Sequence, residues 1–237
     1  MKIKEKIISR QDKINNPLPV IAFIGDSVTQ GCFECFVDKN GQIDTVFRPW
    51  LAYSRLVQDK LLSAFDRAMP VVINAGISGD TARGIYERLD RDVLSFNPDL
   101  TVVSCGLNDS ISGDEKEYGE NLNKIFSSLT DSGSEVIFLT ENMMCTSVSS
   151  SISDDILKSA AKRSARIQND GTLDRFFDVA ISVAKECGVK VCDCYSIWKK
   201  MAKDGVDINS LLINGINHPT PKMHELFADE LVKIILE

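Results

Sequence analysis

Five apolar runs rich in β-branched residues, separated by segments of helical periodicity, constrain the fold of this chain more than any other feature. The runs are Val20–Ile24, Val71–Ile73, Leu100–Val103, Val136–Leu139 and Val189–Cys192. Such an alternation favours a parallel sheet with helices on both faces, because right-handed crossovers place the helices above and below it. The sequence therefore predicts a three-layer α/β/α sandwich built on a five-stranded parallel sheet.

Apolar residues at helical spacing predict the helices between these strands, at about Trp50–Phe65, Thr81–Ser95, Lys116–Ser132, Leu173–Cys187 and Lys222–Ile235. Two connections are longer than a compact fold requires, Cys32–Pro49 and Glu141–Gly171, and the second has room for an extra helix near Asp154–Ile167. Both follow the carboxyl ends of strands, where open α/β sheets bind ligands, so they are candidate walls of a substrate pocket. Solvated loops are the alternative interpretation.

The length of 237 residues fits one α/β domain over 1–237, with 1–18 as an N-terminal extension. No apolar run approaches the roughly 20 residues of a membrane helix. Met1–Asn16 alternates charged residues with isoleucine and lacks the features of a secretory signal, which predicts a cytoplasmic protein without a membrane partner.

The net charge of −7 disfavours nucleic acid as a partner, and the sequence has no basic stripe. Seven cysteines, an odd number, suggest reduced thiols. Cys32 and Cys35 form a CxxC motif, but a zinc site needs a second ligand pair, and Cys192 and Cys194 have the wrong spacing. No metal or cofactor is expected, and the oligomeric state is left open.

A serine follows the first predicted strand, in Gly25-Asp26-Ser27-Val28-Thr29. Serine becomes an effective nucleophile when a base removes its proton. The chain contains two histidines, His218 and His224, both near the C-terminus, which leaves few ways to build a serine–histidine pair.

Four short motifs follow three of the strands and precede the last helix: Gly25-Asp26-Ser27, Asn74 to Thr81, Gly106 to Asp109, and Gly215 to Pro219. Together, and in this order, they resemble the conserved blocks of the SGNH (GDSL-type) hydrolases over about Pro19 to Ala228. The resemblance implies a flavodoxin-like SGNH hydrolase fold and an esterase or lipase-like activity.

Carried over residue by residue, the resemblance makes Ser27 the nucleophile and His218 the general base and acid. It places the Ser27 N–H, the Gly79 N–H and the Asn108 side-chain amide in an oxyanion hole. Acyl transfer develops negative charge on a tetrahedral oxygen, which such donors stabilise. Each residue also has a structural alternative: Ser27 as a helix cap, Gly79 as a turn residue and Asn108 as a partner of loop backbone.

Two neighbours of these residues are assigned structural roles. Asp26 is expected to hold the serine turn through backbone N–H groups, because a carboxylate pointing inward would hinder attack. His224 is expected to cap or pack the last helix, since one base suffices for this chemistry.

The sequence departs from the family at the position of the acid that orients the histidine, where Asn214 stands instead of aspartate. An aspartate fixes the histidine tautomer and stabilises the imidazolium. An asparagine carbonyl can accept the same N–H, so Asn214 is a candidate orienting residue; a backbone carbonyl or another carboxylate such as Asp207 are the alternatives.

The favoured function is hydrolysis of a small carboxylic ester with a short acyl group, with O-acetyl on a carbohydrate as the preferred example, through an acyl-serine intermediate. One alternative is a catalytically impaired SGNH-fold protein that binds a ligand. Others are an acyltransferase, a thioesterase or a lysophospholipase using the same site, since the acyl length and the acceptor are not encoded in the motifs.

Overall fold

A computed structural model describes residues 1–237, with Ser112 described through its backbone alone. Its main sheet has five parallel strands in the spatial order β4 (Val71–Gly76), β1 (Val20–Gly25), β5 (Leu100–Ser104), β6 (Glu135–Thr140) and β7 (Lys190–Asp193). All five predicted strands are confirmed. By order along the chain the sheet reads 2-1-3-4-5, the flavodoxin-like arrangement.

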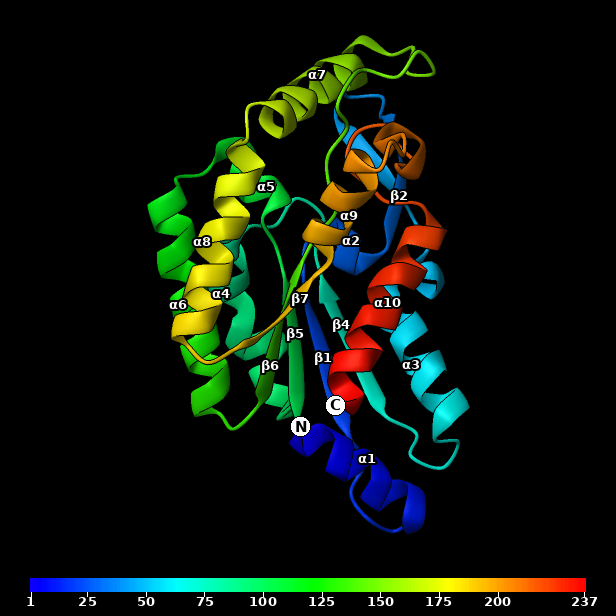
Figure 1. The fold of residues 1–237 in the computed structure, drawn as a ribbon, viewed down its shortest axis with the longest axis vertical. Helices are drawn as coiled ribbons and strands as arrows, with labels where there is room; N and C mark the ends of the chain where they lie inside the picture. Colours follow the sequence, from blue (N-terminus) through cyan, green and yellow to red (C-terminus); the bar gives the residue numbers. More distant parts are fainter.

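Helices cover both faces of the sheet, which confirms the three-layer sandwich (Figure 1). Successive side chains of β1 alternate between the two cores: Ile21 and Phe23 enter one, Ala22 and Ile24 the other. The first core also contains side chains from α1 (Lys2–Asp12), α3 (Tyr53–Ala64), α9 (Cys194–Lys203) and α10 (Pro221–Leu236). The second contains side chains from α4 (Ala82–Asp92), α6 (Glu115–Asp131) and α8 (Thr172–Glu186).

The two long connections are more ordered than loops. Cys32–Pro49 contains an antiparallel hairpin of β2 (Cys32–Val37) and β3 (Ile43–Phe47), which the sequence analysis did not predict. Glu141–Gly171 contains α7 (Asp155–Asn169), which confirms the extra helix. Figure 1 shows α7 lying across the end of the sheet at which β1 and β5 finish.

Several short elements complete the structure and were not predicted individually. They are α2 (Ser27–Gln30), α5 (Leu107–Ser112), η1 (Pro49–Leu51), η2 (Leu94–Phe96) and η3 (Ile208–Leu211). Four residues suffice for one helical turn, too few for periodicity to appear in a sequence.

Helix α1 lies at the opposite end of the sheet from α7 (Figure 1). Its Ile3 and Ile7 are buried, and its Lys6 forms an ion pair of 2.6 Å with Asp99, just before β5. Across the part of the chain that the structure describes, no helix has the length and apolar character needed to cross a membrane.

Candidate active site

Three of the predicted site residues meet at the carboxyl ends of neighbouring strands. Ser27 follows β1, Gly79 follows β4 and Asn108 follows β5. The chain leaves β1 toward β4 on one side and later returns to β5 on the other, and this reversal opens a crevice at the strand ends. The fold thus places the three residues around one crevice.

The serine turn is held by its neighbours. Asp26 caps α2, with its Oδ1 accepting the Val28 N–H at 2.9 Å, which confirms the structural role expected for this carboxyl. A Cβ on Gly25 would lie 2.3 Å from the Ser104 carbonyl oxygen, so only glycine fits between β1 and β5 at this point. The turn leaves Ser27 at 4% exposure.

His218 lies against Ser27. Its Nε2 is 3.0 Å from the Ser27 Oγ, and its Nδ1 is 2.8 Å from the Phe33 carbonyl oxygen. Because that carbonyl can only accept, Nδ1 carries the proton and Nε2 is left to accept from the serine hydroxyl. Burial lowers the pKa of His218 to about 4, and the bond to Phe33 opposes part of that shift. The imidazole is therefore neutral at pH 7 and able to act as a base.

Asn214 shapes the loop that carries His218. Its Oδ1 accepts the backbone N–H groups of Ile216, Asn217 and His218, each at 2.9 Å. Its Nδ2 donates to the Cys35 Sγ at 3.2 Å and to the Asn217 Oδ1 at 3.1 Å. Asn214 thus binds the backbone N–H of His218, whereas the imidazole Nδ1 of His218 binds the Phe33 carbonyl.

Asp207, the other residue considered for this role, is engaged elsewhere. Its side chain caps η3 and accepts the Asn209 N–H at 3.0 Å. The partner that the imidazole does have is a backbone carbonyl on β2, and any residue type could supply it. Side-chain patterns in the sequence therefore carry no signal for it.

Gly79 and Asn108 line the same cavity as Ser27. Gly79 has φ +81° and open space around the site of a Cβ, as a backbone that faces a substrate requires. The Asn108 Nδ2 donates to the Asp26 Oδ2 at 3.1 Å and to the Asp80 carbonyl oxygen at 3.0 Å. The backbone N–H groups of Ser27 and Gly79 donate to no backbone carbonyl in the turns, loops and caps of the described residues.

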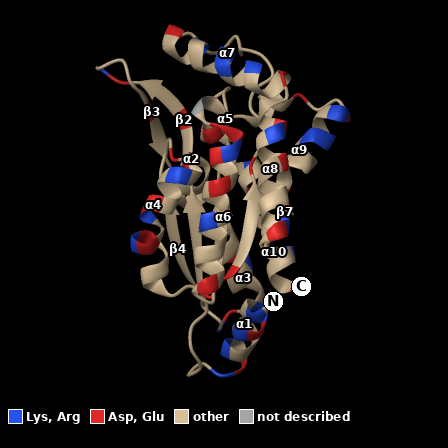
Figure 2. Ribbon diagram, turned by 90° about the vertical axis from the view of Figure 1, so that its left-hand side faces the viewer, with Lys and Arg blue, Asp and Glu red and all other residues tan. Residues whose placement is uncertain are grey.

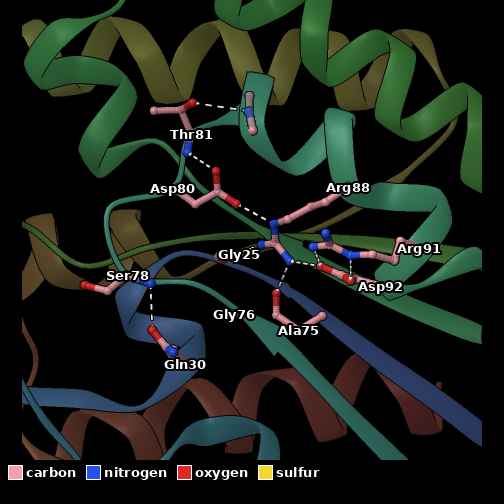
Figure 3. Close-up of polar contacts among 12 residues, drawn as sticks. Gly25, Gln30, Ala75, Gly76, Ser78, Asp80, Thr81, Arg88, Arg91 and Asp92 are labelled. Atoms are coloured by element: carbon pink, nitrogen blue, oxygen red, sulfur yellow. Dashed lines mark hydrogen bonds and ion pairs between the residues drawn. The ribbon is translucent and has the colours of Figure 1, made fainter.

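Arg88, which the sequence analysis missed, ties the strand ends together from α4 (Figure 3). Its guanidinium donates to the Asp80 Oδ2 at 2.7 Å, to the Ala75 carbonyl at 2.6 Å and to the Gly25 carbonyl at 3.1 Å. It thereby connects β1, β4 and the loop of Gly79. An arginine in a helix usually lies on the solvated face, so only its burial reveals this role.

A buried acidic pair lies beneath the site. Asp26 and Glu141 are both fully buried and shift each other's pKa, and the Glu141 Oε2 accepts the Leu107 N–H at 3.3 Å. Burial is the largest cause that raises the pKa of Asp26, to about 6, and it raises the pKa of Glu141 well above its usual range. Glu141 follows β6 without a recognisable motif, so the sequence analysis placed it only in a long connection.

His224 has the structural role that the sequence analysis assigned to it. Its Nδ1 accepts the Tyr53 N–H at the start of α3, at 3.2 Å, and its ring packs between Phe33, Tyr53 and Phe227. Burial lowers the pKa of His224 to about 3, so the side chain is a neutral part of the core.

A cavity of about 220 Å³ opens beside Ser27 and His218. Its walls come from the strand-end loops, the β2–β3 hairpin and α7, so both long connections line it, as the sequence analysis proposed. Cys32 and Cys35 are free thiols on β2. The described residues include no cluster of three His, Cys, Asp or Glu side chains able to hold a metal.

The sequence is similar to a known protein family and to known enzymes. The model of the GDSL-like lipase/acylhydrolase family matches residues 23–226. The chain is 32% identical over 89 residues to an acetylxylan esterase of Geobacillus stearothermophilus, a match covering 38% of this chain and 39% of that protein. It is 26% identical over 233 residues to the isoamyl acetate-hydrolyzing esterase 1 homolog of Mus musculus, covering 92% of this chain and 81% of that protein.

Solved structures share the fold over almost the whole chain. A lipase/acylhydrolase from Enterococcus faecalis superposes with a TM-score of 0.68 at 24% identity, covering 92% of this chain and 96% of that one. An acetylxylan esterase variant from Geobacillus stearothermophilus gives a TM-score of 0.68 at 20% identity, covering 92% and 94%.

Proposed function

The chain belongs to the GDSL-like lipase/acylhydrolase family, and from this premise we propose that it is a serine esterase that hydrolyses a carboxylic ester through an acyl-serine intermediate. The observation that carries the proposal is the 3.0 Å contact between the Ser27 Oγ and a His218 Nε2 that has no proton of its own. A nucleophile bonded to a neutral base is the arrangement that acyl transfer needs.

In the proposed reaction, His218 takes the Ser27 proton as the Oγ attacks the ester carbonyl carbon. The imidazolium then holds its Nδ1 proton on the Phe33 carbonyl, whose dipole partly replaces the charge of a triad aspartate. Nε2–H next donates its proton to the departing alcohol. Water deacylates Ser27 by the same route, with His218 again as base.

The oxyanion of the tetrahedral intermediate is proposed to bind the N–H groups of Ser27 and Gly79 and the amide of Asn108. The Asn108 amide is held in the cavity wall by Asp26 and Asp80. An oxyanion is a stronger acceptor than a neutral carbonyl, so it competes with the Asp80 carbonyl for an amide hydrogen. Losing one such donor typically lowers kcat by about 10²–10³-fold.

The size of the cavity supports a short acyl group. Its volume of about 220 Å³ is below the roughly 300–1,000 Å³ of pockets for drug-sized ligands. An acetyl ester is therefore the preferred substrate class. The acetylxylan esterase among the relatives makes O-acetyl groups on carbohydrates the first natural substrates to test.

The test is hydrolysis of p-nitrophenyl acetate and p-nitrophenyl butyrate by the wild type and by Ser27→Ala. We expect Ser27→Ala to lose activity by a factor on the order of 10⁶, down to background. Ser182→Ala, on the exposed surface of α8, is the matched control and retains full activity. Circular dichroism checks that all three proteins are folded.

Activity that survives in Ser27→Ala would contradict the proposed nucleophile. A folded wild type without activity on these esters or on acetylated xylo-oligosaccharides would favour the ligand-binding alternative. Product analysis with added alcohols or sugars separates hydrolysis from acyl transfer, because both pass through the same acyl-serine.

A further inference from the structure

The cavity beside Ser27 has one charged group in its described lining, the guanidinium of Arg163 on α7. The other titratable groups in that lining are Cys35 and His218. Burial raises the pKa of the Cys35 thiol and lowers that of His218, so both are neutral at pH 7. The cavity is therefore cationic in a chain whose net charge is −7.

Arg163 is available to a ligand. Among the described residues it has no ion pair and no hydrogen bond, whereas Arg48, Arg55, Arg83, Arg88, Arg91 and Arg175 are all paired with carboxylates. No Asp or Glu side chain belongs to the part of the cavity wall that the structure describes. Ser164, the next residue along α7, lines the same cavity, and its hydroxyl group can donate to the same ligand.

Helix α7, which carries Arg163, is anchored near its C-terminal end to the segment that precedes it. The Gln168 Oε1 accepts the Met144 N–H at 2.8 Å, and the Asn169 Nδ2 donates to the Thr146 carbonyl at 2.9 Å. Figure 2 shows Lys and Arg positions along α7 at the same end of the molecule as the β2–β3 hairpin. Helix α7 carries four basic residues, Lys158, Lys162, Arg163 and Arg166, and among them Arg163 alone belongs to the described cavity lining.

We propose that Arg163 makes this site selective for esters that carry a negatively charged group close to the ester bond. A guanidinium binds a carboxylate or phosphate through two parallel N–H donors, and the absence of an acidic neighbour in the described cavity wall leaves those donors for the substrate. The charge belongs either to the acyl group or to the alcohol. The inference rests on the proposed esterase function and adds the substrate class.

The test uses two pairs of esters that differ in charge. Mono-p-nitrophenyl succinate and p-nitrophenyl butyrate place the difference in the acyl group, and 4-acetoxybenzoate and its methyl ester place it in the alcohol. We expect Arg163→Ala to lower kcat/KM for at least one charged ester by about tenfold, mainly through KM, and to leave the neutral esters within about twofold. The pair that responds identifies the charged part of the substrate.

Two further measurements sharpen this result. Arg163→Glu lowers kcat/KM for the charged ester further than Arg163→Ala, and about 0.5 M NaCl reduces the difference between the variants, because salt screens exposed charges. Arg166→Ala, one turn along α7 and outside the cavity lining, is the matched control and leaves both ester pairs unchanged.

Equal effects of Arg163→Ala on charged and neutral esters would overturn the inference and leave the esterase function intact. A second readout does not depend on turnover: calorimetry of 4-acetoxybenzoate and its methyl ester binding to Ser27→Ala, with and without Arg163→Ala. Tighter binding of the charged ester that disappears with Arg163 supports the anion site even if the esterase proposal fails. Binding that is indifferent to Arg163 contradicts it.

Discussion

The Phe33 carbonyl takes the position at the His218 imidazole that a carboxylate takes in a serine–histidine–aspartate triad. A carbonyl fixes the tautomer as well as a carboxylate does, because both can only accept from Nδ1. It stabilises the imidazolium less, because it carries a dipole and no full charge. At the residue scale, the site thus keeps the orientation of its base and has a weaker counter-charge.

Asn214→Asp tests whether the side chain at this position serves the imidazole. We expect kcat to stay the same or fall, because one carboxylate oxygen keeps the three backbone bonds and the other meets the Asn217 Oδ1, also an acceptor. Asn214→Ala should lower kcat, since it leaves the loop of His218 without its acceptor. Steady-state kinetics decide this: a marked rise in kcat for Asn214→Asp would assign the position to the triad acid.

The pH dependence of kcat/KM follows from the burial of His218. A base must be neutral to act, and the pKa of His218 in the folded protein is about 4, so kcat/KM should hold from pH 8 to about 5 and fall with a midpoint near 4. The unfolded chain binds this proton near pH 6.5. Hence the free energy of unfolding decreases as the pH is lowered from about 6.5 to 4. Circular dichroism at each pH therefore checks that the protein is still folded when its rate is measured.

Asp26 and Asp109 are two further groups that titrate in this range, because burial raises the pKa of Asp26 to about 6 and that of Asp109 to about 7. The profile is therefore repeated with Asp26→Asn and with Asp109→Asn, each of which removes one of these titrations. A midpoint near pH 6.5 that remains in both variants would show that the His218 imidazole is solvated in the working enzyme, against the present geometry.

At the scale of elements, Arg88 on α4 secures the loop of Gly79 to β1 and β4. Arg88→Ala breaks a buried ion pair with Asp80 and removes one donor from each of two strand-end carbonyls, so we expect a loss of about 3–5 kcal/mol in unfolding free energy. Because the Gly79 loop also loosens, kcat should fall in the protein that remains folded. Urea unfolding and steady-state kinetics measure the two effects.

Arg83→Ala is the matched control on the same helix, since Arg83 pairs with Glu87 on the surface. It should change the unfolding free energy by no more than about 1 kcal/mol. If Arg88→Ala destabilises the protein and its kcat is unchanged, Arg88 supports the fold alone and has no part in positioning Gly79.

At the scale of the whole molecule, α1 packs at the end of the sheet that is remote from the site. The site occupies the carboxyl ends of the strands, and α1 packs at the amino ends (Figure 1). Ile7→Ala empties a fully buried position on α1 and should cost about 2–5 kcal/mol. Activity at 25 °C should be unchanged, since α1 contributes nothing to the described cavity lining.

Ile8→Ala, at a neighbouring position that is 39% exposed, is the control and should leave the melting temperature almost unchanged. Thermal unfolding followed by circular dichroism, together with ester hydrolysis at 25 °C, measures both variants. A fall in kcat/KM for folded Ile7→Ala would mean that packing at the amino ends reaches the site.

The sequence by itself determined the strands, the long helices and the layers, because burial on both faces of a parallel sheet leaves continuous apolar runs that periodicity detects. The motifs that carry the family resemblance predicted that Ser27, Gly79 and Asn108 belong to one site, and the structure places the three residues after β1, β4 and β5 around one cavity. The β2–β3 hairpin and α1 were not predicted. The hairpin lies within a long connection and pairs with itself outside the main sheet, and α1 is rich in charged residues and packs through contacts distant in the chain, such as Lys6 with Asp99.

Only the tertiary structure decided what orients His218, what holds Gly79 and what charge faces the substrate. The Phe33 carbonyl belongs to the backbone, so the pattern of side chains in the sequence does not reveal it. Arg88 and Arg163 are both arginines on helices, and burial beside Asp80 separates the first from the second, which lines the cavity unpaired among the described residues. The sequence specifies the type of each residue, whereas the burial of a side chain and its hydrogen-bond partners depend on which surfaces the fold brings together.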